Sequence, residues 1–133
     1  MNWKYVKKLK SVELIKEYEC LVNYELCDSF IQCVIRNNGG RPEKKIFDTD
    51  RVKERALKSF LSFNKEDRET VWKMYEWSKE ELNDEFIPFA IDNFGNLICF
   101  DKHDDKIVFV NHEDNSVEIA AVNFDTFIES LHE

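Results

Sequence analysis

The residues best suited to chemistry lie in two acidic, histidine-containing stretches near the end of the chain. They are Asp101, His103, Asp104, Asp105, His112 and Glu113. Carboxylate oxygens and imidazole nitrogens can together bind a divalent cation. These side chains follow no fixed ligand spacing, however, and both stretches fall where predicted strands end. A solvated acidic surface is therefore the favoured interpretation, and we expect neither a metal ion nor another cofactor.

No catalytic motif accompanies these residues. The sequence contains no GxSxG, HExxH, Walker loop, GxGxxG or CxxC pair, the patterns that supply a nucleophile, a zinc site, a phosphate cradle or a redox centre. Trp72, Tyr75 and Trp77 could stack on a sugar or a base, but packing is the commoner role for aromatic residues at helical spacing. We therefore expect a protein that is not an enzyme.

Length and composition predict one domain in a reducing compartment. A chain of 133 residues with eleven phenylalanines can bury a core without a disulfide or a metal, so residues 1–133 are interpreted as a single domain. The cysteines form no paired motif and are predicted to be reduced and mostly buried. The lysine-rich start precedes no apolar segment, and no apolar run approaches the roughly 20 residues of a membrane helix. We expect a cytoplasmic protein that does not bind membranes.

Charge is distributed unevenly along the chain, whose formal net charge is −8. Residues 1–83 carry 17 basic and 15 acidic side chains, whereas residues 84–133 carry 2 basic and 12 acidic ones. An acidic surface repels nucleic acid and attracts basic partners, so no nucleic-acid binding is expected. A charge excess of this kind also serves solubility alone in many proteins. The candidate partner-binding residues are the carboxylates on predicted hairpin loops: Asp101, Asp104, Asp105, Glu113 and Asp114.

The sequence pattern in the second half of the chain predicts a sheet whose hairpin loops carry these carboxylates. Residues 86–91, 96–100 and 106–110 are short runs rich in Ile, Val and Phe, which fit a pleated, half-buried surface. The loops between them are too short for parallel crossovers, so the three strands should form an antiparallel meander. Gly95 falls where the first hairpin loop needs a positive φ. Residues 117–122 supply a fourth strand.

Helices are predicted before, between and after these strands. The first begins near Ser11, the second spans residues 28–38, and the third runs from Lys65 to about Lys79 with Asn64 as its N-cap. The second helix ends at an Asn-Gly-Gly-Arg-Pro run, because glycine adopts the left-handed cap conformation and proline prevents continuation. Asn123 is predicted to cap a last helix.

Two short strands complete an α+β fold. Residues 46–47 and 57–63 are predicted as strands, although a helix also fits the second range. The fold is then a mainly antiparallel sheet, with the central meander at 86–110 and flanking strands, packed with N-terminal, middle and C-terminal helices. Residues 1–10 are a basic segment that either contacts a membrane or nucleic acid or docks loosely through its aromatic residues. We favour docking, with the lysines solvated.

Several of these stretches resemble the SUKH superfamily, which includes the yeast Smi/Knr-like cell-wall regulators and many small bacterial proteins. The resemblance covers about Leu14 to Leu131. Its most specific part is the Ile-Pro-Phe-Ala-x-Asp to Gly-Asn segment at residues 87–96. The Asn-Gly-Gly-Arg-Pro run at 38–42, the Val-Phe and His-Glu pairs at 108–113 and the closing segment at 123–127 match as well.

This resemblance implies an α+β domain with a non-enzymatic role. For small bacterial members it implies an immunity protein, which binds a polymorphic toxin, often a nuclease, and masks its basic active-site surface. The expected partner is thus a basic, nuclease-like toxin, and the alternative is a non-enzymatic interaction or scaffold module of a regulatory or signalling complex. The resemblance supplies no catalytic residues. It implies structural roles for Gly39, Gly40, Pro42, Pro88 and Gly95.

Overall fold

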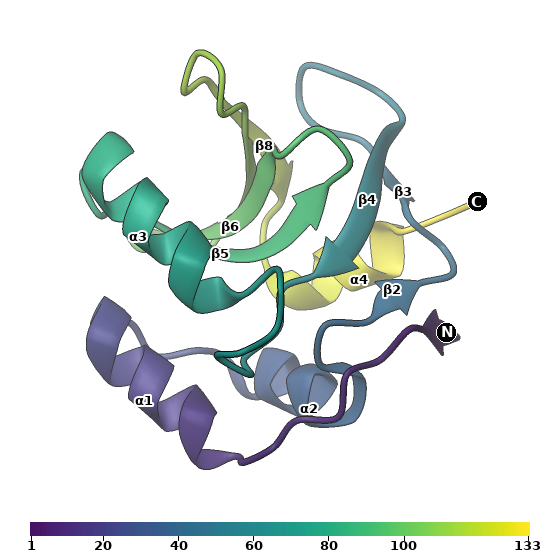
Figure 1. Cartoon of the computed structure of the whole chain (residues 1–133). Coiled ribbons are helices and arrows are strands. Elements are labelled where there is room, and N and C mark those ends of the chain that lie inside the picture. Colours follow the sequence, from purple (N-terminus) through teal and green to yellow (C-terminus); the bar gives the residue numbers. More distant parts are fainter.

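Six consecutive strands form one antiparallel sheet at the centre of the protein (Figure 1). The computed structural model describes all 133 residues. The strands lie side by side in chain order, and they are β3 (Ile46–Phe47), β4 (Arg55–Phe60), β5 (Phe86–Asp92), β6 (Leu97–Asp101), β7 (Ile107–Val110) and β8 (Val117–Ala121). Every neighbouring pair is antiparallel. The predicted central meander and the α+β class are confirmed.

Strand β5 runs through the most buried part of the sheet. Residues Ile87 to Asp92 are all buried, although Pro88 has no N–H to donate to a neighbouring strand. The pairing of β5 with β6 shifts register between Pro88 and Ala90, and such an irregularity is where a proline is tolerated within a sheet. The Pro88 carbonyl accepts a hydrogen bond of 3.2 Å from the hydroxyl of Tyr18. This proline therefore also helps to attach the first helix to the sheet.

Four helices pack against the sheet: α1 (Glu13–Val22), α2 (Asp28–Asn37), α3 (Val71–Glu81) and α4 (Phe124–Ser130). A phenylalanine cluster joins α2, α4 and β5, with the Phe30 ring 5.2 Å from Phe124 and 5.4 Å from Phe89. Helix α3 lies along β5, and Tyr18 of α1 contacts Trp72 edge-on at 5.4 Å (Figure 1). Trp72 thus packs within the fold, as the favoured interpretation expected.

Both edges of the sheet are covered by the chain itself. At the β3 edge, Ile46 and His132 exchange two backbone hydrogen bonds of 2.9 Å. At the β8 edge, Ile119 donates its N–H to the Asp50 carboxylate and accepts a bond from the Asp50 N–H, each 2.8 Å long. The sheet therefore curls so that the loop after β3 reaches β8. At each edge, one strand residue thus has its backbone N–H and carbonyl bonded within the chain, which hinders pairing with a second chain.

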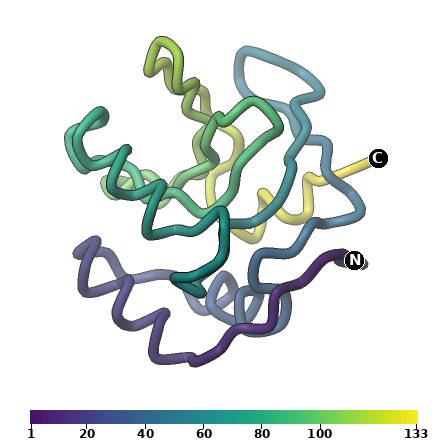
Figure 2. Tube along the Cα trace, in the orientation of Figure 1, coloured from purple at the N-terminus to yellow at the C-terminus, as the bar shows by residue number.

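Residues 1–10 lie against the domain through specific bonds. Strand β1 (Trp3–Lys4) pairs antiparallel with β2 (Arg41–Pro42), and Figure 2 shows the N-terminal segment running beside that part of the chain. The Trp3 ring meets Phe60 edge-on at 5.0 Å. Farther along, the Lys7 N–H donates to the Asn38 carbonyl at 2.8 Å. The lysines of this segment remain exposed.

The third helix begins six residues later than predicted. Helix α3 starts at Val71, and its N-cap is Thr70, whose hydroxyl accepts a 3.2 Å bond from the Lys73 N–H. The buried side chain of Asn64 instead accepts from the Lys10 N–H and donates to the Lys8 carbonyl, both at 2.9 Å. The prediction failed because the side-chain oxygen of Asn64, the atom that would cap a helix, accepts from the distant Lys10 N–H, although the side-chain amide also donates to Asp67 at 3.2 Å.

Two other predictions need correction. Strand β4 covers Arg55–Phe60 and ends before Leu61, so the predicted strand at 57–63 is shifted toward the C-terminus. Only one cysteine, Cys99, is buried, whereas Cys20 and Cys27 are exposed, so the prediction of mostly buried thiols is wrong. Cys20 is exposed because α1 turns other residues toward the core: Ile15, Tyr18 and Val22. No helix of the protein is both long enough and apolar enough to span a membrane.

Candidate functional site

The predicted partner-binding carboxylates lie at the two ends of the meander rather than on one surface. Asp101, Asp104 and Asp105 belong to the connection between β6 and β7, and Glu113 and Asp114 to the connection between β7 and β8. These connections leave opposite ends of β7, which is about 13 Å long at a rise of ~3.3 Å per residue. We call residues 82–85 and 101–106 the helix end. We call the loops at 48–54, 93–96 and 111–116 the hairpin end.

Most carboxylates of the helix end already have partners within the chain. Asp84 accepts a 2.7 Å bond from the Tyr75 hydroxyl and pairs with Lys102 at 3.2 Å. Burial opposes ionisation of Asp84, but these two contacts hold the pKa of its carboxyl below the ordinary value. Asp105 accepts a 2.5 Å bond from the Tyr24 hydroxyl, which raises the pKa of Tyr24 together with burial. This acidic surface is thus partly neutralised before any partner arrives.

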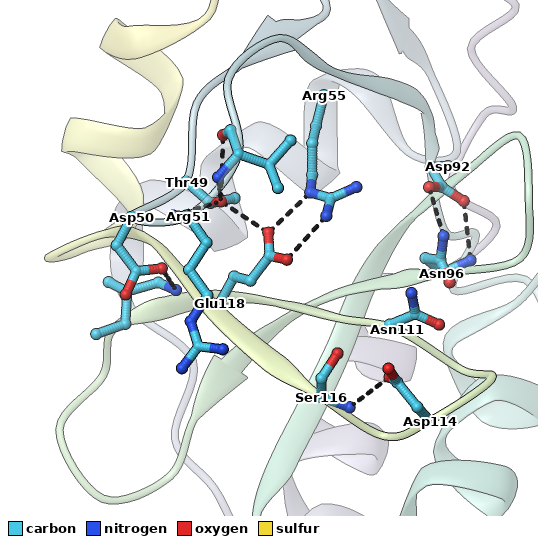
Figure 3. A network of polar contacts seen from close by, with 12 residues as sticks. Thr49, Asp50, Arg51, Arg55, Asp92, Asn96, Asn111, Asp114, Ser116 and Glu118 are labelled. Carbon is cyan, nitrogen blue, oxygen red and sulfur yellow. Dashed lines mark hydrogen bonds and ion pairs between the residues drawn. The ribbon is translucent and has the colours of Figure 1, made fainter.

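At the hairpin end, Glu118 fastens the loop at 48–54 to strand β8 (Figure 3). Its carboxylate receives two 2.8 Å bonds from the Arg55 guanidinium and one of 2.7 Å from the Thr49 hydroxyl. The bonds from Arg55 hold the pKa of Glu118 below its ordinary value, although burial acts in the opposite direction. The guanidinium also lies 3.9 Å from the centre of the Phe109 ring. Loop and sheet are therefore joined by a partly buried ion pair.

A chain of hydrogen bonds fixes the β5–β6 hairpin against the loop at 111–116. The Asp92 carboxylate accepts from the backbone N–H of Asn96 at 2.8 Å and from its side-chain amide at 3.0 Å (Figure 3). Asn96 in turn accepts from the His112 N–H at 3.1 Å. His112 donates through Nε2 to the Phe94 carbonyl at 2.7 Å, and it lies over Gly95, whose φ is +83° as the hairpin requires. Both loops are held in one relative position.

This fixed hairpin presents Phe94 to solvent with 79% of its surface exposed. Beyond His112, Asp114 accepts a 2.9 Å bond from the Ser116 N–H, and hydrogen bonding from the Ser116 side chain and backbone lowers the pKa of the Asp114 carboxyl. The Glu113 carboxylate has no hydrogen-bond or ion-pair partner within the chain. An exposed aromatic side chain and a free carboxylate on adjoining loops are a combination suited to protein recognition, because buried aromatic anchors dominate many interfaces.

The sequence prediction missed Phe94. The signal was present, because a phenylalanine inside the polar turn Asp-Asn-Phe-Gly-Asn has no strand or helix face through which to enter a core. The residues weighed as a metal site are not brought together: His103 lies at the helix end and His112 at the hairpin end, and no three His, Cys, Asp or Glu side chains form a group that could hold a metal ion.

The chain matches the profile of the SMI1-KNR4 cell-wall family, SUKH_6, over residues 12–128. The protein therefore belongs to this family, which confirms the resemblance to the SUKH superfamily. No curated protein matches the chain.

Proposed function

We propose that this member of the SMI1-KNR4 cell-wall family is a cytoplasmic immunity protein of a bacterium, which binds a cognate polymorphic toxin through its hairpin end. The observation that carries the proposal is the exposed Phe94, whose backbone carbonyl is bonded to His112 of the loop that also carries Glu113 and Asp114. The resemblance to small bacterial SUKH proteins implies a protein that neutralises a toxin by binding rather than by catalysis. A surface with one aromatic anchor and exposed carboxylates suits that role.

The proposed partner is a nuclease-like toxin because its substrate dictates its charge. A nuclease attracts phosphate and therefore has a basic cleft, which an acidic loop can find through long-range attraction. Docking then buries Phe94, and complete burial of such a side chain contributes about 1.5–3 kcal/mol. In this mechanism the carboxylates accelerate association and the aromatic ring slows dissociation. The toxin is inhibited because its cleft is covered, and no chemical step by the immunity protein is required.

A non-enzymatic interaction or scaffold module is the second candidate, favoured by the cell-wall description of the matched family. Its client would be a regulatory or cell-wall protein instead of a toxin. Gene neighbourhood separates the two proposals, because an immunity gene lies next to the gene of its toxin.

Co-expression with the adjacent candidate toxin tests the immunity proposal. Wild type should restore growth, whereas Phe94→Ala should weaken toxin binding by about 30-fold or more, the factor expected from loss of a ~2 kcal/mol anchor. Val122→Ala is the matched control, because Val122 is also apolar and 62% exposed but follows β8 at the opposite end of that strand from the 111–116 loop. Toxicity that is equal with and without the wild-type protein would refute the immunity proposal.

A pair of charge-neutralised variants tests which end meets the toxin. Glu113→Gln/Asp114→Asn and Asp104→Asn/Asp105→Asn remove the same number of charges, and each Asn keeps an oxygen acceptor for the local bonds to Ser116 and Tyr24. Stopped-flow association at low salt should slow with the first pair and change much less with the second. If association instead slows mainly with the second pair, the toxin contacts the helix end.

A further inference from the structure

A second surface of the protein is positively charged, in contrast to the acidic loop that carries Glu113 and Asp114 at the hairpin end. Two adjoining hollows, each of about 280 Å³, lie between the β1–β2 ribbon and strand β4. They share Tyr5, Arg41 and Lys58, so they form one continuous depression that we call the basic groove. Asn93 of the β5–β6 hairpin lines one of the hollows. The basic groove therefore begins beside the hairpin end without including its carboxylates.

Cations outnumber carboxylates along this groove. Two acidic residues, Glu43 and Glu69, face six basic ones: Lys4, Lys7, Arg41, Lys45, Lys58 and Arg68. One of these cations is neutralised, because Lys58 Nζ pairs with the Glu69 carboxylate at 3.0 Å. The other five make no salt bridge within the chain: Lys4, Lys7, Arg41, Lys45 and Arg68. In a protein of net charge −8, this is a local positive surface with uncompensated charge.

The cations from the first residues of the chain are held in place rather than trailing in solvent. Lys4 pairs with Arg41 in the β1–β2 register. Around Lys7, the backbone donates to the Asn38 carbonyl at 2.8 Å and accepts a 2.9 Å bond from the Asn38 side-chain amide. Asn38 is buried and also accepts from the Phe63 N–H at 2.8 Å. The backbone that carries these cations is therefore fixed, while their side chains are exposed.

Tyr5 marks the groove as a contact surface. Its ring is 70% exposed and lies at the boundary of both hollows, with the Arg41 guanidinium 5.1 Å from the ring centre. Tyr5 also has a φ of +55°, which is uncommon for a bulky residue and costs conformational energy. An aromatic ring held in solvent by strained backbone, beside unpaired cations, has the composition of a recognition site.

We propose that the basic groove binds an Asp/Glu-rich polypeptide segment of a partner protein. Carboxylates of such a segment can pair with the free lysines and with Arg68, while Tyr5 covers its backbone. Nucleic acid fits less well, because a long polyanion would extend past Asn93 toward Glu113 and Asp114 and would meet the negative field of the whole protein. The groove thus selects a short acidic stretch. This binding is separate from toxin recognition at the hairpin end.

Fluorescence anisotropy with a fluorescein-labelled Glu/Asp peptide tests the proposal on the full chain. The wild type should bind at low salt, and Lys4→Glu/Lys45→Glu should weaken binding by at least about tenfold, since two attractive charges become repulsive. The control Lys16→Glu/Lys53→Glu makes the same change in net charge at exposed lysines outside the groove, and it should bind much as the wild type does. Tyr5→Ala should weaken binding without altering charge, and urea unfolding should show that each variant remains folded.

Other results would overturn the assignment. Equal losses in the groove and control variants would show diffuse attraction instead of a site. Tighter binding of a single-stranded oligonucleotide than of the peptide would identify a nucleic-acid surface. Self-association that Lys4→Glu/Lys45→Glu abolishes would place the acidic loops of a second copy in the groove. Toxin protection in cells should be unaffected by the groove variants, so failure here leaves the proposed function intact.

Discussion

The ion pair between Arg55 and Glu118 should be the main fastening of the loop at 48–54, and Glu118→Gln tests this. The two side chains are 23% and 10% exposed, so solvent screens the pair only in part. Breaking an exposed pair costs about 0–1 kcal/mol and breaking a fully buried one about 3–5 kcal/mol. The substitution also places an amide against a guanidinium that has few other partners. We therefore expect a loss of about 2–3 kcal/mol in the free energy of unfolding near neutral pH.

The loss should depend on pH in a defined direction. The pKa of Glu118 is lowered in the folded protein, so its stabilising contribution is fully present above the unfolded value of about 4.3 and disappears as pH falls through the folded value. Urea unfolding followed by tryptophan fluorescence should give a constant difference between wild type and Glu118→Gln from neutral pH down to about 5. As the pH falls below the unfolded value and through the lowered folded value, the two unfolding curves should converge.

A double-mutant cycle supplies the control and the refutation. Arg55→Met alone leaves a desolvated carboxylate, whereas Arg55→Met with Glu118→Leu removes both charges and should recover much of the loss. A cost below about 0.5 kcal/mol for Glu118→Gln, or a difference that persists unchanged at acid pH, would show that the loop is held by its other contacts.

Three further substitutions or measurements follow from local geometry. Gly40→Ala should destabilise the fold by about 1–3 kcal/mol in urea unfolding, because the added Cβ would lie 2.9 Å from a backbone carbonyl. Thr70→Ala should cost about 1 kcal/mol by the same assay through loss of the α3 N-cap, and no change would contradict the corrected helix start. A thiol reagent should modify Cys20 and Cys27 rapidly and Cys99 only on unfolding, because burial removes access and raises the pKa of the Cys99 thiol.

Local sequence patterns were sufficient to predict the structure wherever a residue's role depended on its sequence neighbours. The meander was predictable because short apolar runs and tight polar loops allow only antiparallel pairing. The N-cap at Asn123 was predictable because its side chain bonds to Thr126, three residues away. Asn64 failed the same test because its side-chain oxygen accepts from the Lys10 N–H, which lies more than fifty positions earlier, instead of capping a helix.

Whether the candidate surfaces could be predicted also depended on whether their residues are neighbours in the sequence or meet only in the folded chain. The charge excess of residues 84–133 was visible in the sequence, and so was the placement of its carboxylates on hairpin loops. Their division between two ends follows from strand direction. Two carboxylates receive tyrosine hydroxyls from elsewhere in the chain: Asp105 from Tyr24, in the connection between α1 and α2, and Asp84 from Tyr75 of α3. The positive surface came from two distant segments, residues 4–7 and 41–68, and no window of sequence contains it.

The sequence by itself determined the class of fold, the family and the acidic bias of the second half, because each depends on composition and on short-range patterns along the chain. Tertiary structure alone decided that Glu118 joins strands at opposite sides of the sheet and that lysines from the N-terminus meet Arg41. These features depend on contacts between residues far apart in sequence, and curling of the sheet is what brings such residues within bonding distance.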